Sequence, residues 1–506
     1  MSIIAKAEVE ARYDVVVVGG GFGGLASALT LAEKGARVLL CEALAYPGGC
    51  ASTFTRKGWR FETGATLFSG FGEGHLMQGW IARHGLPVEV ERLDPMVTLR
   101  SPGFELPVPP DRDAFVAHLC ALPGAPAARI RAYFDEHTRV ATSLWEVFAD
   151  PSLLPPFDLR ALLAHAGRSP RYLPLLRGIG QPLGRVLARH GLQDFAPLRL
   201  WLDATCQITV QCGLDQAEAP FAMAASDYYF QGTGHVRGGI GVLAEALVGA
   251  IRGLGGEVRL ASRVARIAPD ENGWRVEVRG ETVWAPQVVL NTLPQGAVKL
   301  LDDAHGAFPR QVARLQARGA RVAGGWGACM LYLGLRPGAE LPPGAHHLQI
   351  VQDPAQPLRE GNHLFASVSG LDEEGRSPEV GGRTVTVSTH VPLDGWRALD
   401  EAGRAARTRE VQGRMWEGLV AHAPTLAEAV VARMPGSPRT WERFTRRSEG
   451  AVGGIPRVAG LHNYTEFGPV QALPGVWLVG DSVFPGQSTL ATALGGVRVA
   501  DAVGRA

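Results

Sequence analysis

The spacing of glycines near the N-terminus predicts a phosphate-binding turn. Gly19, Gly21 and Gly24 form the pattern G-x-G-x-x-G directly after the apolar run 13–18. The first glycine of such a pattern permits a tight bend, the second lets the backbone approach a pyrophosphate, and the third lets helix and strand pack closely. Glu42, at the end of the next expected strand, is placed to bind a ribose hydroxyl. In this context we favour a dinucleotide site over a tight βα turn that binds nothing.

Two further glycine-rich segments favour a flavin over a nicotinamide dinucleotide. Gly48 and Gly49 follow soon after Glu42, and Gly480-Asp481 ends an apolar run near the C-terminus. An acidic residue after a strand, followed by a glycine turn into a helix, can bind a ribityl chain and direct helix N–H groups at a flavin ring. A nicotinamide enzyme needs no second contact so far along the chain.

The elements around these glycines form a βαβ opening. The run 13–18 is the β-branched pattern of a parallel strand buried on both faces, 25–33 has helical character, and 36–41 is the second strand. Elsewhere we expect mostly helix over 76–230, a helix over 240–254, strands at 274–278, 288–290, 328–333 and 384–390, helix over 403–434, and a last helix from Ser488.

Composition excludes several protein classes. A chain of 506 residues needs two or more domains, and 64 glycines with 35 prolines stay below a low-complexity composition. A net charge of +1 provides no global field to gather nucleic acid. The six scattered cysteines form no disulfide framework, and no histidine or cysteine spacing suits a metal. The start of the chain does not read as a signal peptide and no apolar run could span a bilayer, so we expect a cytoplasmic protein without a bound metal.

Taken together, these segments resemble the FAD-dependent family of carotenoid desaturases, carotenoid isomerases, retinol saturases and, more distantly, amine oxidases. The resemblance covers nearly the whole chain in family order and rests on the glycine pattern and on 48–49, 60–66, 238–240, 262–267 and 480–488. The turn at 484–487 looks particularly like the carotenoid branch. What the resemblance implies is an α/β fold, with a doubly wound, Rossmann-type FAD-binding domain and an inserted substrate domain of helices plus mixed sheet.

The resemblance also implies roles for individual residues. Glu42 would bind the adenosine ribose, the backbone of Val264 would touch adenine, and Asp481 would bind the ribityl or pyrophosphate region. Gly486 and Gln487 would lie near the flavin ring. The complete set of expected cofactor-binding residues is Gly19, Gly21, Gly23, Gly24, Glu42, Gly48, Gly49, Val264, Gly480, Asp481, Pro485, Gly486, Gln487 and Ser488.

Two positions depart from the family pattern. Cys50 stands where the family often has arginine, and Glu62 where it often has aspartate. A free cysteine at such a place is more often a small packed side chain, and a redox thiol is the alternative.

By this resemblance the FAD-binding domain is discontinuous. It would comprise 1–75, 226–300 and 440–506. Residues 76–225 would form a helical lid that contacts a membrane, and 301–439 the sheet and helices of the substrate domain.

The resemblance implies oxidation of a long, carotenoid-like polyene by FAD, and the leading function is carotenoid desaturation. In that reaction a hydride passes to flavin N5 as a C=C bond forms. A carotenoid isomerase or a polyene saturase is the alternative on the same fold, and a flavin amine oxidase the alternative of another class. The sequence assigns no catalytic residue; the histidines considered as proton carriers are His235, His346, His347, His363 and His390.

Residues 159–200 combine basic and apolar side chains. Seven arginines face one acid, Asp194, and leucines interleave with them. Such a segment suits the interface of an anionic bilayer, which would place the protein at the inner face of a membrane. The alternative is a lid helix whose arginines are solvated. No nucleic-acid-reading module accompanies the charge, and the oligomeric state stays open.

Overall fold

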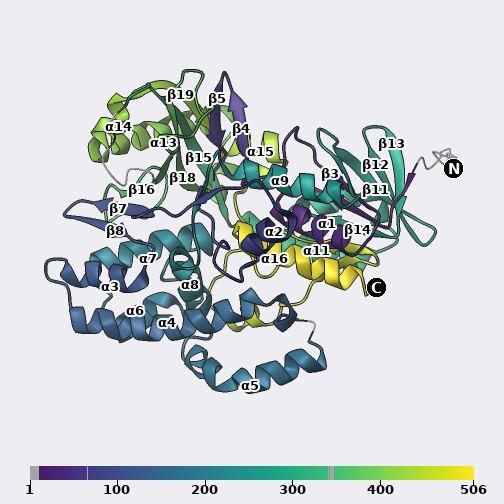
Figure 1. Ribbon diagram of the computed structural model, residues 1–506, viewed down its shortest axis with the longest axis horizontal. Coiled ribbons are helices and arrows are strands. Elements are labelled where there is room, and N and C mark those ends of the chain that lie inside the picture. The colour runs from purple at the N-terminus through teal and green to yellow at the C-terminus, as the bar shows by residue number, and fades with distance from the viewer. Residues whose placement is uncertain (1–10, 65, 156, 340, 342–346, 506) are drawn as a thin grey trace.

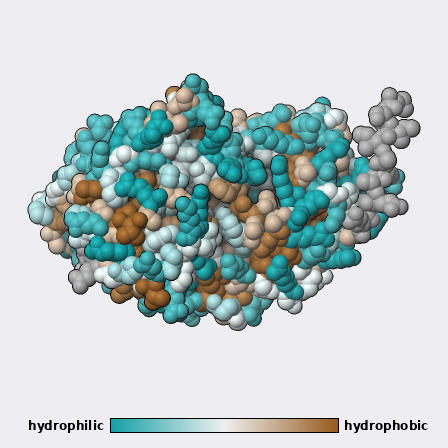
Figure 2. Space-filling model, turned by 90° about the horizontal axis from the view of Figure 1, so that it is seen from above, coloured by the Kyte–Doolittle hydropathy of each residue, from teal (hydrophilic) through white to brown (hydrophobic). Residues whose placement is uncertain are grey.

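The computed structural model describes residues 11–64, 66–155, 157–339, 341 and 347–505. Figure 1 shows three regions: a nucleotide-binding region on the right, a large sheet with its helices at upper left, and a group of helices at lower left. Helix α5 (Leu159–Leu176) projects below this last group. The face seen from above in Figure 2 is mainly hydrophilic, with apolar residues in small groups.

A six-stranded sheet forms the centre of the nucleotide-binding region. Its strands, in spatial order, are β10 (Glu257–Arg259), β3 (Val38–Cys41), β2 (Val15–Val18), β14 (Gln287–Leu290), β21 (Val476–Leu478) and β20 (Val470–Leu473). All neighbouring pairs are parallel except β20 with β21. The strands come from each of the three stretches assigned to the FAD-binding domain, so distant parts of the chain must meet to complete this sheet.

The valine run of β2 is buried because both faces of the sheet are covered. Val15 and Val17 pack among residues of α1 (Phe22–Glu33), α9 (Ile240–Gly253) and α16 (Thr489–Val503). Val16 and Val18 pack among residues of a second sheet on the opposite face. Its strands are β1 (Ala11–Arg12), β13 (Glu281–Ala285), β12 (Gly273–Val278) and β11 (Val264–Asp270). This layering is the physical reason for a strand with no polar face.

A seven-stranded mixed sheet forms the second region. Its strands are, in order, β19 (Val430–Gly436), β15 (Trp326–Leu335), β18 (Arg383–Pro392), β17 (His363–Val368), β16 (His347–Val351), β7 (Val97–Ser101) and β8 (Phe104–Val108). Helices α13 (Glu401–His422) and α14 (Pro424–Glu428) contribute to the core cluster on this sheet.

Two expectations about this region were wrong. Residues 97–108 are a hairpin in the large sheet and not part of a helical segment. Pro107 is tolerated there because β8 is an edge strand, where its missing N–H leaves no ladder bond unmade. The helix expected over 403–434 ends earlier, because 430–436 pairs with β15 as strand β19.

The lower-left helices enclose a separate core. They are α3 (Arg112–Ala121), α4 (Ala127–Ala149), α6 (Leu183–Arg189), α7 (Ala196–Thr209) and α8 (Ala219–Ser226). Phe115, Tyr133 and Trp201 are fully buried among them. Helix α5 differs, since Ala161 is its one buried residue. None of the described helices combines the length and the apolar character that crossing a membrane requires.

Candidate functional site

The fingerprint turn (residues 19–24) connects β2 to α1 in a conformation that only glycine permits. Gly19 has φ +101°, and a Cβ there would lie 2.7 Å from the carbonyl oxygen of Asn291. A Cβ on Gly24 would lie 2.0 Å from the carbonyl oxygen of Gly19. Helix α1 begins after Gly21 with no side-chain cap and no acidic residue in its first turn. Its first N–H groups therefore remain free to bind an anion.

Asn291 lies at the centre of this turn and was missed by the sequence reasoning. It follows β14, and its Nδ2 donates to the carbonyl oxygen of Gly19 at 3.3 Å. A Cβ added to Gly21, Gly23 or Gly480 would lie within 3.0 Å of its side-chain amide. Asn291 therefore binds the fingerprint turn and lies close to the first residue of the C-terminal Gly-Asp segment. The one signal for it is its place after a parallel strand of the central sheet.

Glu42 lies beside the fingerprint turn, as expected. Its Oε2 accepts a hydrogen bond from Gly20 N at 2.6 Å and its Oε1 accepts from Leu44 N at 2.8 Å. Burial raises the pKa of Glu42 even though these backbone donors favour its charged form. The Glu42 carbonyl accepts from Ser262 N at 2.7 Å, which brings the start of β11, and with it Val264, close to Glu42.

The twin glycines pack directly on the fingerprint turn. Gly48 N donates to the carbonyl oxygen of Gly20 at 2.8 Å, and Gly48 forms an isolated parallel bridge with Gly21. Gly48 has φ +108°, and a Cβ there would lie 2.5 Å from the carbonyl oxygen of Ala51. Segments separated by more than twenty residues thus form one continuous backbone surface.

The Gly-Asp segment after β21 carries a partly buried ion pair. The Arg447 guanidinium lies 2.7 Å from Oδ2 of Asp481 and also donates to the carbonyl oxygens of Ala451 and Gly453. Burial lowers the pKa of Arg447, but the charge of the paired Asp481 carboxylate opposes it, and the net shift is upward. The sequence reasoning did not identify Arg447.

Cys50 lies near the same ion pair. Burial raises the pKa of the Cys50 thiol, while the Arg447 charge opposes the rise only in part. A thiol with a raised pKa remains protonated at neutral pH and is a poor nucleophile. This favours the packed side chain over the redox thiol.

Glu62 holds the start of α9. Its carboxylate accepts from Thr53 Oγ1 at 3.0 Å and from Ile240 N at 3.3 Å, at the positive end of that helix. Arg376 Nη2 lies 3.6 Å from Glu62 Oε1. Glu62 is therefore a buried link between the nucleotide-binding region and the loop before β18.

The C-terminal turn (residues 480–488) leads into α16. Ser488 Oγ accepts from Ala491 N at 3.0 Å and caps the helix. Gln487 Nε2 donates to the carbonyl oxygen of Ile208 at 3.0 Å, which leaves Gln487 Oε1 buried with no donor among the described residues. Gln211 Oε1 is also buried and has no donor among the described residues. A Cβ on Gly453 would lie within 2.3 Å of both oxygens, so two unsatisfied acceptors meet at one point beside the turn.

An apolar cavity of about 200 Å³ opens beside this turn. Its lining includes aromatic rings from α4, α8 and the segment after α8, together with Pro485, Gln487 and the first residues of α16. None of its lining residues in the described chain is Asp, Glu, Lys or His. The lining residues with polar side chains are Ser69, Trp145, Thr209, Gln211, Tyr228, Arg457, Gln487, Ser488 and Thr489.

The histidines considered as proton carriers lie elsewhere. His235 pairs with the buried carboxylate of Glu373. Burial lowers the pKa of His363 to about 3 and that of His390 to about 4, so both are neutral at physiological pH. His346 lies outside the described residues. The described candidates absent from the cavity lining are His235, His347, His363 and His390.

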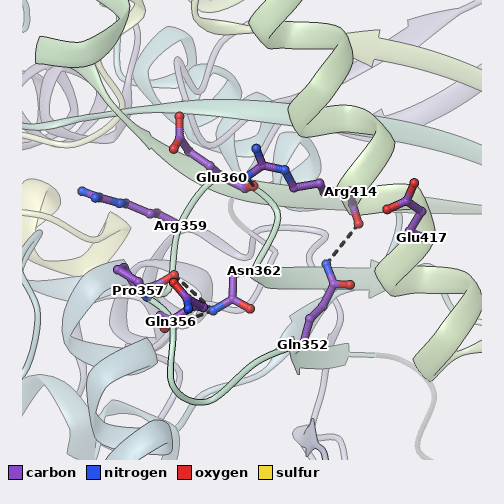
Figure 3. Close-up of a pocket in the computed structure, with 8 residues that line it drawn as sticks. All are labelled: Gln352, Gln356, Pro357, Arg359, Glu360, Asn362, Arg414 and Glu417. Carbon is purple, nitrogen blue, oxygen red and sulfur yellow. Dashed lines mark hydrogen bonds between the residues drawn. The ribbon is translucent and has the colours of Figure 1, made fainter.

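A second, polar hollow of about 490 Å³ lies away from the nucleotide-binding turns (Figure 3). It lies between the β16–β17 loop and α13, and its polar groups are mostly engaged with one another. Gln352 Nε2 donates to the carbonyl oxygens of Gly361 and Arg414, and Asn362 holds the loop through four hydrogen bonds. Glu360 is paired with Arg407. These bonds explain the shape of the loop without a ligand.

Comparison with known proteins assigns the family. The sequence profile of the family described as flavin containing amine oxidoreductase matches residues 22–321. The chain belongs to this family. Flavin containing amine oxidoreductases use FAD, which is therefore the cofactor, and the α/β fold class expected from the sequence is confirmed. The chain is a flavin-dependent oxidoreductase related to enzymes of carotenoid metabolism.

Comparisons with individual proteins show which members of the family the chain resembles. The chain is 27% identical to prolycopene isomerase of Arabidopsis thaliana over 98% of this chain and 83% of that protein. It is 28% identical to the neurosporene-forming phytoene desaturase of Cereibacter sphaeroides over 54% of this chain and 52% of that protein. A solved structure of a putrescine oxidase variant aligns with TM-score 0.64 at 16% identity, covering 98% of this chain and all of that one. This last likeness concerns the fold.

The residues described above fit FAD. The free N–H groups of α1 suit a pyrophosphate, and the bare glycine surface leaves room for it to approach. The orphaned oxygens of Gln211 and Gln487 can accept from a ring N–H at the C-terminal turn. When bound, FAD supplies two-electron chemistry by accepting or returning a hydride.

Proposed function

We propose that the protein acts on a carotenoid-like polyene in the apolar cavity beside the C-terminal turn. The observation that carries this proposal is a cavity lined mainly by apolar and aromatic groups next to the residues expected to hold the flavin ring. A polyene needs such a wall and has few polar groups to satisfy. The named activities of the relatives support the same substrate class.

Within that class, the cavity favours cis–trans isomerisation. Desaturation removes a hydride and a proton and so requires a base, whereas an isomer contains the same hydrogens as its substrate. The described lining holds no carboxylate, lysine or histidine. Burial raises the pKa of Tyr228 well above its ordinary value, so its phenol stays protonated at neutral pH and is not available as a base. Desaturation, which the sequence favoured, is our second candidate and is supported by the likeness to a phytoene desaturase.

The surrounding residues keep water from the reacting bond. Trp145 Nε1 donates to the carbonyl oxygen of Ala224 at 3.0 Å, which fixes the indole in the wall. Phe148 and Phe221 both lie near Phe484, with ring centroids 6.2 and 6.4 Å away. The cationic Arg457 in the lining disfavours a protonated amine substrate, which argues against amine oxidation.

Product analysis under anaerobic conditions, with the flavin reduced and with it oxidised, tests the proposal. We expect an acyclic poly-cis carotenoid to give a product of unchanged mass with a shifted absorption spectrum. A product lighter by two hydrogens would establish desaturation instead, and one heavier by two hydrogens saturation. No turnover of any polyene would overturn the substrate class.

A variant whose cavity is blocked provides the matched comparison for this assay. Ala225→Phe, which fills the cavity, is expected to cut turnover at least ~10-fold because the polyene no longer fits. Ala406→Phe, on the exposed face of α13, is expected to change nothing.

We further propose that α5 binds the surface of an anionic membrane. Its exposed leucines are 52% to 74% accessible and lie on one helical face: Leu159, Leu162, Leu163, Leu173 and Leu176. Arg160 and Arg171 lie to one side of this face, and Arg171 pairs with Glu146 of α4. The segment first considered, 159–200, is too long, because Leu183 and Leu187 are fully buried in the helical core.

Flotation with vesicles of phosphatidylglycerol and phosphatidylcholine tests the membrane contact. Leu163→Glu/Leu173→Glu should lower the floated fraction at least ~10-fold, since two apolar anchors are lost and two negative charges are added. The control is Leu371→Glu, at a leucine that is 66% exposed on a distant loop. Equal flotation of both variants would refute the role of α5.

A further inference from the structure

Arg457 is the one lining residue of the apolar cavity with a formal charge in the described chain. Its guanidinium donates from Nη2 to the carbonyl oxygen of Pro485 at 3.0 Å and forms no ion pair among the described residues. The rings of Phe221 and Phe484 lie 5.3 and 5.6 Å from Cζ. A guanidinium has five N–H donors, so most of its hydrogen-bonding capacity is unused here.

The carboxylates near Arg457 are already engaged. Glu466 pairs with both Arg318 and Arg321, and Glu218 accepts from Gly180 N, Gly460 N and Tyr464 Oη. Burial lowers the pKa of Arg457 to about 10, and the neighbouring Arg321 charge adds to the effect; the group is still charged at neutral pH. This part of the protein therefore carries excess positive charge facing an apolar space.

Arg498, in the same region, shows how an arginine with a structural role has its N–H donors paired. It is almost fully buried beside the same ring, Phe484, and donates to the carbonyl oxygens of Phe484, Pro155 and Phe467. Arg457 has one carbonyl partner and faces the cavity instead. Arg457 is partly exposed, and a charge that faces an apolar space with few partners is costly unless a ligand supplies the acceptor.

We propose that Arg457 binds an oxygen-bearing end group of the polyene, a carboxylate or a hydroxyl or carbonyl oxygen, within this cavity. The inference rests on the proposed polyene function and adds to it the class of substrate end group. The cavity, at about 200 Å³, is smaller than the ~300 Å³ at the lower end of small-molecule pockets. The cavity therefore encloses only one part of a long polyene. Arg457 offers a hydrogen bond to an oxygen atom in that part, and a hydrocarbon end has no oxygen to accept it.

Binding of two matched probes tests this role. The FAD-loaded protein is titrated with retinoic acid and with the C20 hydrocarbon in which a methyl group replaces the carboxylate, and the flavin absorbance reports binding. We expect the wild type to bind the carboxylate ~10- to 100-fold more tightly, as for a charge-assisted hydrogen bond. Arg457→Met should lose that preference while its affinity for the hydrocarbon stays within ~2-fold.

Further variants separate this role from a structural one. Arg457→Lys keeps the charge and should retain part of the preference, which keeps the test available if Arg457→Met fails to fold. Arg310→Met, at an exposed arginine of α11 (Pro309–Ala323), is the control. Equal loss of both probes would show that Arg457 only supports Pro485, and an altered flavin spectrum without ligand would show that it faces the ring. Either result, or no preference in the wild type, overturns the inference.

This design also separates the inference from the proposed function. If the wild type prefers the carboxylate but converts no polyene, the function fails and the role of Arg457 stands. If polyenes are converted without any preference for an oxygen end group, the function stands and the role of Arg457 fails.

Discussion

Gly24→Val is expected to yield protein that retains less than ~10% of the wild-type FAD. The added Cβ would lie 2.0 Å from the carbonyl oxygen of Gly19, which is backbone and cannot move aside cheaply. The helix start must shift away from β2, and the surface expected to bind the pyrophosphate opens with it. Absorbance at 450 nm relative to 280 nm of the purified protein measures the retained flavin.

Gly249→Ala is the matched control for this variant. Gly249 lies on an exposed position of α9, and a Cβ there would meet nothing within 4 Å. Alanine should raise stability by about 1 kcal/mol, because it loses less backbone entropy than glycine in a helix. Wild-type flavin content in Gly24→Val would contradict the close packing that the structure shows.

Asp481→Ala is expected to lower both stability and FAD retention. The variant leaves the Arg447 guanidinium without its partner carboxylate. In the wild type the side chains of Arg447 and Asp481 are only 15% and 16% exposed. An ion pair broken in this way costs about 3 kcal/mol, the lower end for buried pairs, because some solvent still reaches it. For a chain of this size we expect Tm to fall by about 3 °C in a thermal melt.

A double variant separates the two effects of Asp481. Asp481→Ala/Arg447→Met removes both charges, so most of the lost stability should return. FAD retention should stay low, because we expect the Asp481 carboxylate to bind the ribityl or pyrophosphate region. If retention recovered together with Tm, Asp481 would act only through Arg447.

The nucleotide-binding half could be predicted because its signals are local. The run of β2 shows burial on both faces, and the glycines at 19–24 mark a bend that other residues cannot adopt. The last helix begins at Thr489, one residue after the expected start at Ser488. Each of these features depends on residues adjacent in the chain.

The features that sequence reasoning missed depend on distant partners. Asn291 matters because β14 places it between Gly19 and Gly480, and no neighbouring residue marks it. Strand β19 reads as the end of a helix until it pairs with β15, since tertiary pairing outweighs local propensity. Arg457 becomes notable only when the cavity around it is known.

The packing of α1 against α16 has a consequence for biosynthesis. Eleven of the twelve residues of α1 are buried, and Ser27 Oγ donates to the carbonyl oxygen of Gly496 at the other end of the chain. At a translation rate of ~5–20 residues per second, the apolar surface of α1 waits roughly 25–90 s for α16 to be made. During that interval α1 lacks its packing partner, and the region that joins α1 to α16 can be completed only once α16 has been made.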